Sequence, residues 1–193
     1  IDLKVVERHN GCLITPITKH TANCRLRSIK AFFKWLEYEE IINRCPKLDM
    51  FAVDDPTPSY LTTNQMLLIE HFIRENYIRD YNFLVWRVIK FYLDTGLRLR
   101  EPFQNSTRLD GNKLFAISSK KSHPRKLTLS DYNVKTFKDL LEHNHRPEYW
   151  SRKFLTVCKA VGIEDRHFHN LRHTFITRTY YETGDIYLTM PRF

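Results

Sequence analysis

The sequence predicts a mainly α-helical protein with one small antiparallel β-sheet, an α+β fold. Several segments carry apolar residues at every third or fourth position, which is the spacing of one helix face. Asp110-Gly111 stands between two short extended segments and is a strong hairpin signal. A stretch with two prolines at 54–59 separates two parts of the chain. The 193 residues, 42% of them hydrophobic, are enough for one large domain or two small ones.

The clearest helical pattern covers residues 21–45. One face carries four apolar residues at helical spacing, namely Leu26, Ile29, Phe33 and Leu36. Another face carries three basic residues at the same spacing, namely Arg27, Lys30 and Lys34. Thr21 can cap the start of this helix and Pro46 can stop it. The basic face fits either a solvated surface or a contact with a phosphate backbone.

The stretch at 54–59 is the predicted linker, because prolines and small polar residues disfavour helix and sheet. This places a boundary near residue 58 and predicts domains at 1–57 and 58–193. Thr62 and Gln65 form a capping box for a helix that continues to about residue 76. A second helix is predicted from about 81 to 94, with Val85, Ile89 and Tyr92 facing inward and Gly96 at its end.

The second half of the chain contains the predicted sheet and two more helices. Segments 113–117 and 126–129 are predicted as strands, joined by residues 118–125. Pro147 and Gly162 bracket a helix at about 148–161. Gly184 ends a last helix at about 167–182.

The chain is strongly basic, with 31 Lys and Arg against 22 Asp and Glu and a net charge of +9. This balance favours a polyanionic partner such as nucleic acid, although a basic surface that binds nothing is the alternative. The four cysteines show no CxxC spacing and are predicted to be reduced, mostly buried thiols of a cytoplasmic protein. The sequence shows no signal peptide and no apolar run of membrane-spanning length.

Two short segments carry the residues that could act on a phosphate: Thr95-Gly96-Leu97-Arg98-Leu99-Arg100-Glu101 and His169-Asn170-Leu171-Arg172-His173-Thr174. An arginine fork matches phosphate geometry and keeps its charge. His169 and Arg172 are three residues apart and so share one helix face. The alternatives are a surface ion pair between Arg98 and Glu101, and histidines that only pack in the core. A metal site at His169 and His173 is disfavoured, because no carboxylate with metal-site spacing accompanies them.

In this order and spacing, the two segments resemble the tyrosine recombinases, the family of phage integrases and Xer-type recombinases. The resemblance implies a partial helical core-binding (SAM-like) DNA-binding domain at 1–57 and a C-terminally truncated catalytic domain at 58–193. It implies that Arg98 and Arg172 clamp the scissile phosphate and that His169 assists proton transfer. It also implies a lysine in the turn between two strands that protonates the leaving 5′ oxygen; Lys120 fits best, with Lys121 as the alternative.

The same resemblance implies what the protein acts on. The family cleaves and rejoins double-stranded DNA through a 3′-phosphotyrosine as a homotetramer, without ATP, another cofactor or an essential metal. The protein would then be cytoplasmic, encoded by a bacterium or a phage, with no membrane partner. Further DNA contacts are expected from five basic residues: Arg27, Lys30, Lys34, Lys121 and Arg125.

The end of the chain departs from the family pattern. The family continues after the position of Gly184-Asp185 into an LGH-type motif and then the nucleophilic tyrosine, whereas this sequence stops at Phe193. We therefore expect this chain alone to bind DNA without cleaving it. The alternatives are a non-catalytic DNA-binding prophage remnant, or an inhibitor of an intact integrase. A metal-dependent nuclease that uses the histidine cluster is a third hypothesis.

Overall fold

The computed structural model describes residues 8–9, 12–13, 17–53, 59–76, 80–117 and 125–185. The chain divides into two compact units, Ile1–Thr57 and Pro58–Phe193. The described residues are mostly helical with one three-stranded antiparallel sheet in the second unit, which confirms the predicted fold class. None of the described helices is long and apolar enough to cross a membrane.

The first unit consists of a short antiparallel pair, β1 (Arg8–His9) and β2 (Cys12–Leu13), followed by α1 (Lys19–Tyr38). Thr18, not Thr21, caps α1, because its hydroxyl accepts a hydrogen bond from the Thr21 amide at 3.2 Å. The helix ends well before Pro46, since Glu40 adopts a left-handed conformation with φ of 57° and turns the chain back. The predicted helix at 21–45 is therefore too long at its end.

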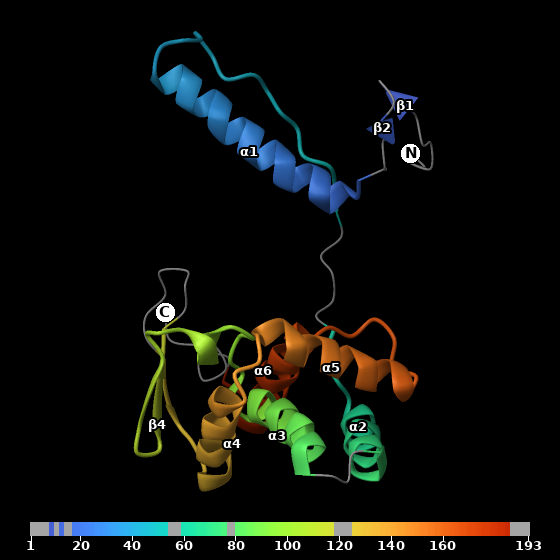
Figure 1. Ribbon diagram of the computed structural model, residues 1–193. Helices are drawn as coiled ribbons and strands as arrows, with labels where there is room; N and C mark the ends of the chain where they lie inside the picture. Colours follow the sequence, from blue (N-terminus) through green and yellow to red (C-terminus); the bar gives the residue numbers. More distant parts are fainter. Residues whose placement is uncertain are drawn as a thin grey trace. The chain divides into compact units, whose positions relative to one another are not determined.

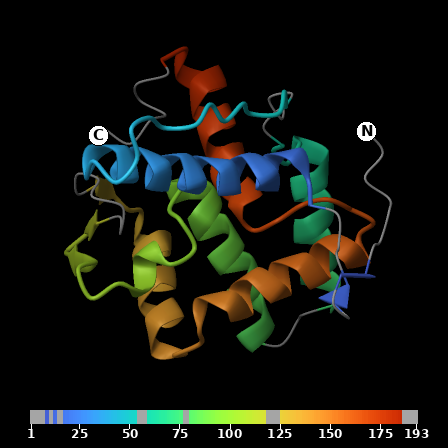
Figure 2. The ribbon, with the colours of Figure 1, turned by 90° about the horizontal axis from the view of Figure 1, so that it is seen from above.

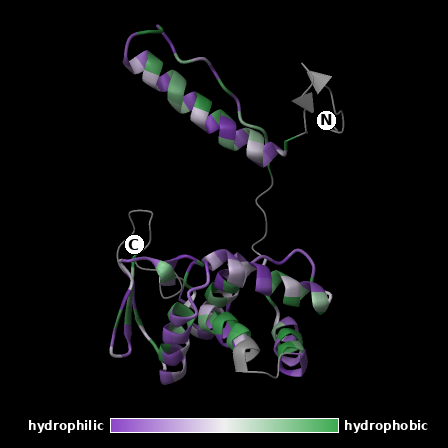
Figure 3. Ribbon diagram, viewed as in Figure 1, coloured by the Kyte–Doolittle hydropathy of each residue, from purple (hydrophilic) through white to green (hydrophobic). Residues whose placement is uncertain are grey.

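The returning chain packs along α1. The Asn23 side chain binds the backbone of Phe51 in both directions, donating to its carbonyl and accepting from its amide at 2.9 Å each. The predicted apolar face is only partly covered, since Ile29 is 44% exposed, and hydrophobic residues occur along the whole length of α1 in Figure 3. On the predicted basic face, Arg27 and Lys34 are exposed and Lys30 is half-buried.

The second unit is built around α3 (Asp80–Thr95). It contacts α2 (Thr63–Asn76), α4 (Asp131–Glu142), α5 (Pro147–Ala160) and α6 (His169–Thr183), as Figures 1 and 2 show. Because helices cover α3 on several sides, its inward residues Val85, Ile89 and Tyr92 are at most 2% exposed, as predicted. The end of α3, the segment after it and the start of α6 are thereby held in one rigid core.

Local signals account for most of the helix ends in this unit. Thr62 and Gln65 form the predicted capping box in both directions, with bonds of 3.1 and 3.3 Å. Gly184 follows α6 in a left-handed conformation, as predicted for a C-terminal glycine. The helix α4 was not predicted; Ser130 caps it, and Phe137 and Leu140 are buried.

The sheet lies at one edge of this unit, beside α4 (Figures 1 and 2). It contains β3 (Arg108–Asp110), β4 (Lys113–Ala116) and β5 (Arg125–Thr128) in that order. Asp110 pairs with Lys113, which confirms the predicted hairpin. Ala116 pairs with Arg125, so Arg125 stands at the base of the connection between β4 and β5. Residues 118–124 of this connection, including Lys120 and Lys121, lie outside the described residues.

Candidate functional site

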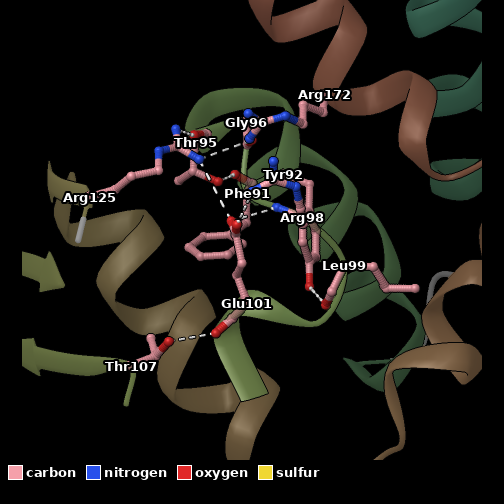
Figure 4. A network of polar contacts seen from close by, with 10 residues as sticks. All are labelled: Phe91, Tyr92, Thr95, Gly96, Arg98, Leu99, Glu101, Thr107, Arg125 and Arg172. Atoms are coloured by element: carbon pink, nitrogen blue, oxygen red, sulfur yellow. Dashed lines mark hydrogen bonds and ion pairs between the residues drawn. The ribbon is translucent and has the colours of Figure 1, made fainter. Parts of the chain in front are cut away.

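The site is built on the turn that follows α3. Gly96 has φ of +59°, a conformation that side-chain-bearing residues rarely adopt. A Cβ atom at this position would lie 2.2 Å from Cδ1 of Phe175 on α6. Only glycine therefore allows α6 to pack this closely against the turn, and the carbonyl groups of the turn point into the site (Figure 4).

Glu101 is the acidic centre of the site, and its side chain is only 2% exposed. It is the first residue of a short 3-10 helix, η1 (Glu101–Phe103). Its Oε1 accepts from Nη1 of Arg98 and its Oε2 accepts from the Arg98 amide, both at 2.8 Å. The Arg98–Glu101 ion pair that the sequence allowed is thus present, but its carboxylate is buried and not on the surface.

Arg172 approaches the same turn from α6. The residue is 8% exposed, and its Nη1 donates to the Gly96 carbonyl. Burial lowers the pKa of Arg172 to about 10, with further lowering by the charges of Arg125 and Arg98 and a smaller opposing effect of Glu101. Arg172 remains charged at neutral pH and is oriented by a backbone carbonyl.

Arg125 is the third arginine of the site. Its Nη2 donates to the Thr95 carbonyl at 3.3 Å, and its Nη1 donates to the Gly96 carbonyl at 3.4 Å. The same Nη1 lies 3.7 Å from Oε2 of Glu101, and the Arg125 side chain is 9% exposed. Burial lowers the pKa of Arg125, with Glu101 opposing this effect. Arg125 was predicted as a DNA contact; its burial against the turn could not be read from the sequence.

His169 begins α6 and is exposed at the edge of the arginine cluster. Partial desolvation lowers the pKa of His169, and electrostatic interactions with His173, Arg172 and Arg98 lower it further. The rings of His169 and His173 meet edge to face, with centroids 4.8 Å apart. His169 is therefore mainly neutral at pH 7 in the free protein.

The start of α6 is held by the segment that precedes α2. The Asn170 side chain donates to the Ser59 carbonyl at 2.7 Å, and the Leu61 amide donates to the Thr174 hydroxyl at 2.9 Å. Asn170 and Thr174 are themselves buried. These contacts fix α6 on the core, so the positions of His169 and Arg172 do not depend on surface groups alone.

The charges of this site do not balance. Among the described residues, the three guanidinium groups of Arg98, Arg125 and Arg172 gather around the Gly96 turn with one carboxylate, that of Glu101, which contacts the first two. This leaves a surplus of two positive charges in a partly buried place, which an anion can offset. The Arg98 side chain, at 39% exposed, is the most open of the three and marks the side from which an anion can enter. Phosphate oxygens are the acceptors that such forks bind best.

Arg27, Lys30 and Lys34 are on α1 in the first unit, and Lys120 and Lys121 lie outside the described residues. Within the part of the chain that the structure describes, no group of three His, Cys, Asp or Glu side chains could hold a metal ion. Thus the structure brings together Arg98, His169 and Arg172, and adds Arg125 and Glu101 to them.

Neither a family model nor a curated protein sequence matches this chain. Several solved structures do. The Tn1549 transposon integrase in complex with circular intermediate DNA is 16% identical, with a TM-score of 0.69 over 91% of this chain and 71% of that one. A lambda integrase dimer bound to a COC′ core site is 16% identical, with a TM-score of 0.62 over 89% and 70%. XerH site-specific recombinase bound to difH substrate is 15% identical, with a TM-score of 0.63 over 91% and 58%. The chain has the fold of these integrases and site-specific recombinases, which confirms the resemblance at the level of the fold.

Proposed function

We propose that this protein is a site-specific DNA recombinase or integrase in which Arg98 and Arg172 hold a phosphodiester of duplex DNA. The observation that carries the proposal is the surplus of positive charge around the Gly96 turn, where the described residues place three arginines with one buried carboxylate. A metal-free phosphodiester site needs fixed cations at the oxygens that gain charge in the transition state. Arg98 and Arg172 are such cations and come from two segments that the fold joins.

The remaining groups take complementary roles in this proposal. His169, whose pKa is lowered, is neutral at pH 7 and can accept a hydrogen bond or a proton beside the phosphate. Lys120 is proposed as the acid that protonates the leaving 5′ oxygen, with Lys121 as the alternative. The proposal assigns no nucleophile, and Tyr180 and Tyr181 on α6 are 46% and 77% exposed and lie eight or more residues beyond Arg172.

The proposed partner is double-stranded DNA. The net charge of +9 favours it, and the solved structures of similar fold include complexes with DNA. One of them is a lambda integrase tetramer bound to a Holliday junction, and a homotetramer on DNA is accordingly part of the proposal. Residues 1–57 are proposed as part of a core-binding domain that contacts DNA through Arg27, Lys30 and Lys34, with Lys121 as a further contact. Residues 58–193 are proposed as the catalytic domain.

A binding titration tests the phosphate site. Fluorescence anisotropy of a labelled duplex is measured at several salt concentrations for the wild type, R172M and R178M. Arg178 is the matched control, because it lies on the same helix with its side chain 49% exposed and pairs only loosely with Glu182 at 3.8 Å. R172M should weaken binding by about 10-fold or more, as expected for lost hydrogen bonds to a charged group. It should also reduce the log–log salt slope by about 1.

R178M should leave both quantities nearly unchanged. Equal losses in R172M and R178M would show that only general charge is measured, and the phosphate site would be rejected. R172K, which keeps the charge, separates fork geometry from charge, and thermal unfolding shows whether each variant is folded. A nicked suicide duplex run on a denaturing gel separates strand transfer from binding alone: a covalent adduct supports a recombinase. Tight binding without an adduct supports the alternative, a DNA-binding remnant or inhibitor.

A further inference from the structure

Arg125 contacts two protein groups that also bind the two arginines proposed to hold the phosphate. It shares the Gly96 carbonyl with Arg172, and it shares the Glu101 carboxylate with Arg98. Its second nitrogen is taken by the Thr95 carbonyl at 3.3 Å. Figure 4 shows these contacts around the end of α3. Arg125 therefore links the two groups that orient Arg98 and Arg172, although it comes from the sheet and not from either motif.

The three arginines differ in the protein groups that their donors already bind. The Arg98 side chain is 39% exposed, whereas that of Arg125 is 9% exposed with its donors directed at protein oxygens. Both Nη atoms of Arg125 donate to protein carbonyls, whereas the hydrogen bond from Arg172 to the Gly96 carbonyl uses Nη1. Arg125 is the first residue of β5, so its hydrogen bond to the Thr95 carbonyl also joins the sheet to the end of α3.

We propose that Arg125 is a positioning residue, which holds the Gly96 carbonyl and the Glu101 carboxylate in place for Arg172 and Arg98 and does not itself bind the phosphate. The inference rests on the proposed function and deepens it. It replaces the sequence-based interpretation of Arg125 as a DNA contact. A lysine cannot do the same work, because a single ammonium group lacks the planar fork that reaches two carbonyls and a carboxylate together.

Two variants separate geometry from charge. R125M removes both the fork and the positive charge, whereas R125K keeps the charge. If Arg125 acts by position, both variants weaken duplex binding by about 10-fold, which corresponds to about 1.4 kcal/mol. R125K with wild-type affinity would show that only the charge of Arg125 matters, and the positioning role would be rejected.

A double-mutant cycle tests whether Arg125 acts through Arg172. R125M is made in the wild type and in R172M, and duplex affinity is measured in all four proteins. The part of the effect that acts through Arg172 is lost when Arg172 is gone, so R125M should change the affinity of R172M by less than 10-fold, and the remaining change acts through Glu101 and Arg98. Equal losses on both backgrounds would show that Arg125 does not act through Arg172 and would overturn the inference.

The control is R87M. Arg87 on α3 is 15% exposed at its side chain and pairs with Asp139 of α4, so its loss removes a half-buried ion pair that does not involve the Gly96 turn. R87M should lower the thermal stability without changing duplex affinity. If R125M fails to fold, the comparison is made with R125K alone.

The two proposals fail differently. An unchanged affinity in R172M rejects the phosphate site itself. A loss in R172M together with wild-type affinity in R125M and R125K rejects only the role of Arg125.

Discussion

Gly96→Ala is the most direct test of how the site is built. Two separate physical effects act at this position. The backbone has φ of +59°, and a Cβ would lie 2.2 Å from Cδ1 and 2.8 Å from Cε1 and Cγ of Phe175. The substitution therefore strains the turn and also pushes α6 away from it, without removing any existing contact.

The magnitude follows from these two effects. A left-handed conformation costs a residue with a Cβ about 1–2 kcal/mol. Carbon atoms in contact prefer separations of about 3.5–4.0 Å, so the Phe175 ring or the turn must shift by more than about 1 Å. Overpacking of this kind costs about 1–3 kcal/mol. We expect Gly96→Ala to lower the free energy of unfolding by about 2–5 kcal/mol, which is a large part of the stability of a typical domain.

Gly111→Ala is the matched control. Gly111 has nearly the same backbone conformation, with φ of +58°, but nothing lies within 4 Å of its Cβ position. It should cost only the backbone part, about 1–2 kcal/mol. Urea unfolding of both variants measures the difference, and the extra cost of Gly96→Ala should disappear when it is measured in a Phe175→Ala protein. Equal losses for the two glycine variants would refute the reasoning, because the close approach of α6 would then contribute nothing.

Three further outcomes are expected. Glu101→Gln removes the buried negative charge and should destabilise the protein by about 3 kcal/mol in phosphate-free buffer. Added phosphate should raise the melting temperature of this variant more than that of the wild type. Equal shifts in melting temperature would contradict this expectation. Because the folded-state pKa of His169 is lowered, the unfolded chain protonates first as pH falls, so stability drops as the pH falls through the ordinary imidazole pKa of about 6.5. His169→Asn should reduce the dependence of the unfolding free energy on pH, measured by urea titrations at several pH values. An unchanged dependence would show that His169 does not cause it. Thr174→Val deprives the Leu61 amide of its acceptor and should cost about 1–3 kcal/mol, with faster hydrogen exchange at Leu61; a protected amide would show another partner.

Features that depend on neighbouring residues could be predicted from the sequence. The capping box at Thr62 and Gln65 and the hairpin at Asp110-Gly111 both formed as expected, because each is decided within a few residues. The end of α1 could not be predicted in this way. Nothing in the local pattern requires the chain to reverse at Glu40, and the reversal is stabilised by the distant contact between Asn23 and Phe51.

The candidate site shows the same division. Arg98 and Arg172 were selected because each stands in a recognisable segment. Glu101 was noticed only as a neighbour of Arg98, and its burial depends on how the sheet and the helices close around it. Arg125 meets the turn across 29 residues of sequence and Arg172 meets it across 76. Contacts between residues so far apart in the sequence produce no periodic pattern in it, so only the structure could show that Arg125 and Arg172 meet at the same turn. Lys120 stays a prediction.

The way the arginines are oriented explains why the site can keep its charge for a ligand. A carboxylate that paired with Arg172 would orient it well but would also compete with any phosphate for the same fork. The Gly96 carbonyl orients Arg172 through a dipole, so its full charge remains. The Glu101 carboxylate is bound instead by Arg98 and Arg125, where it limits the repulsion among three cations. A second carboxylate would stabilise the free protein and weaken phosphate binding, whereas the loss of Glu101 would increase the repulsion within the cluster and destabilise the free protein. One acid among three arginines is therefore the balance that a site needs if it is to fold without its anion and still bind it.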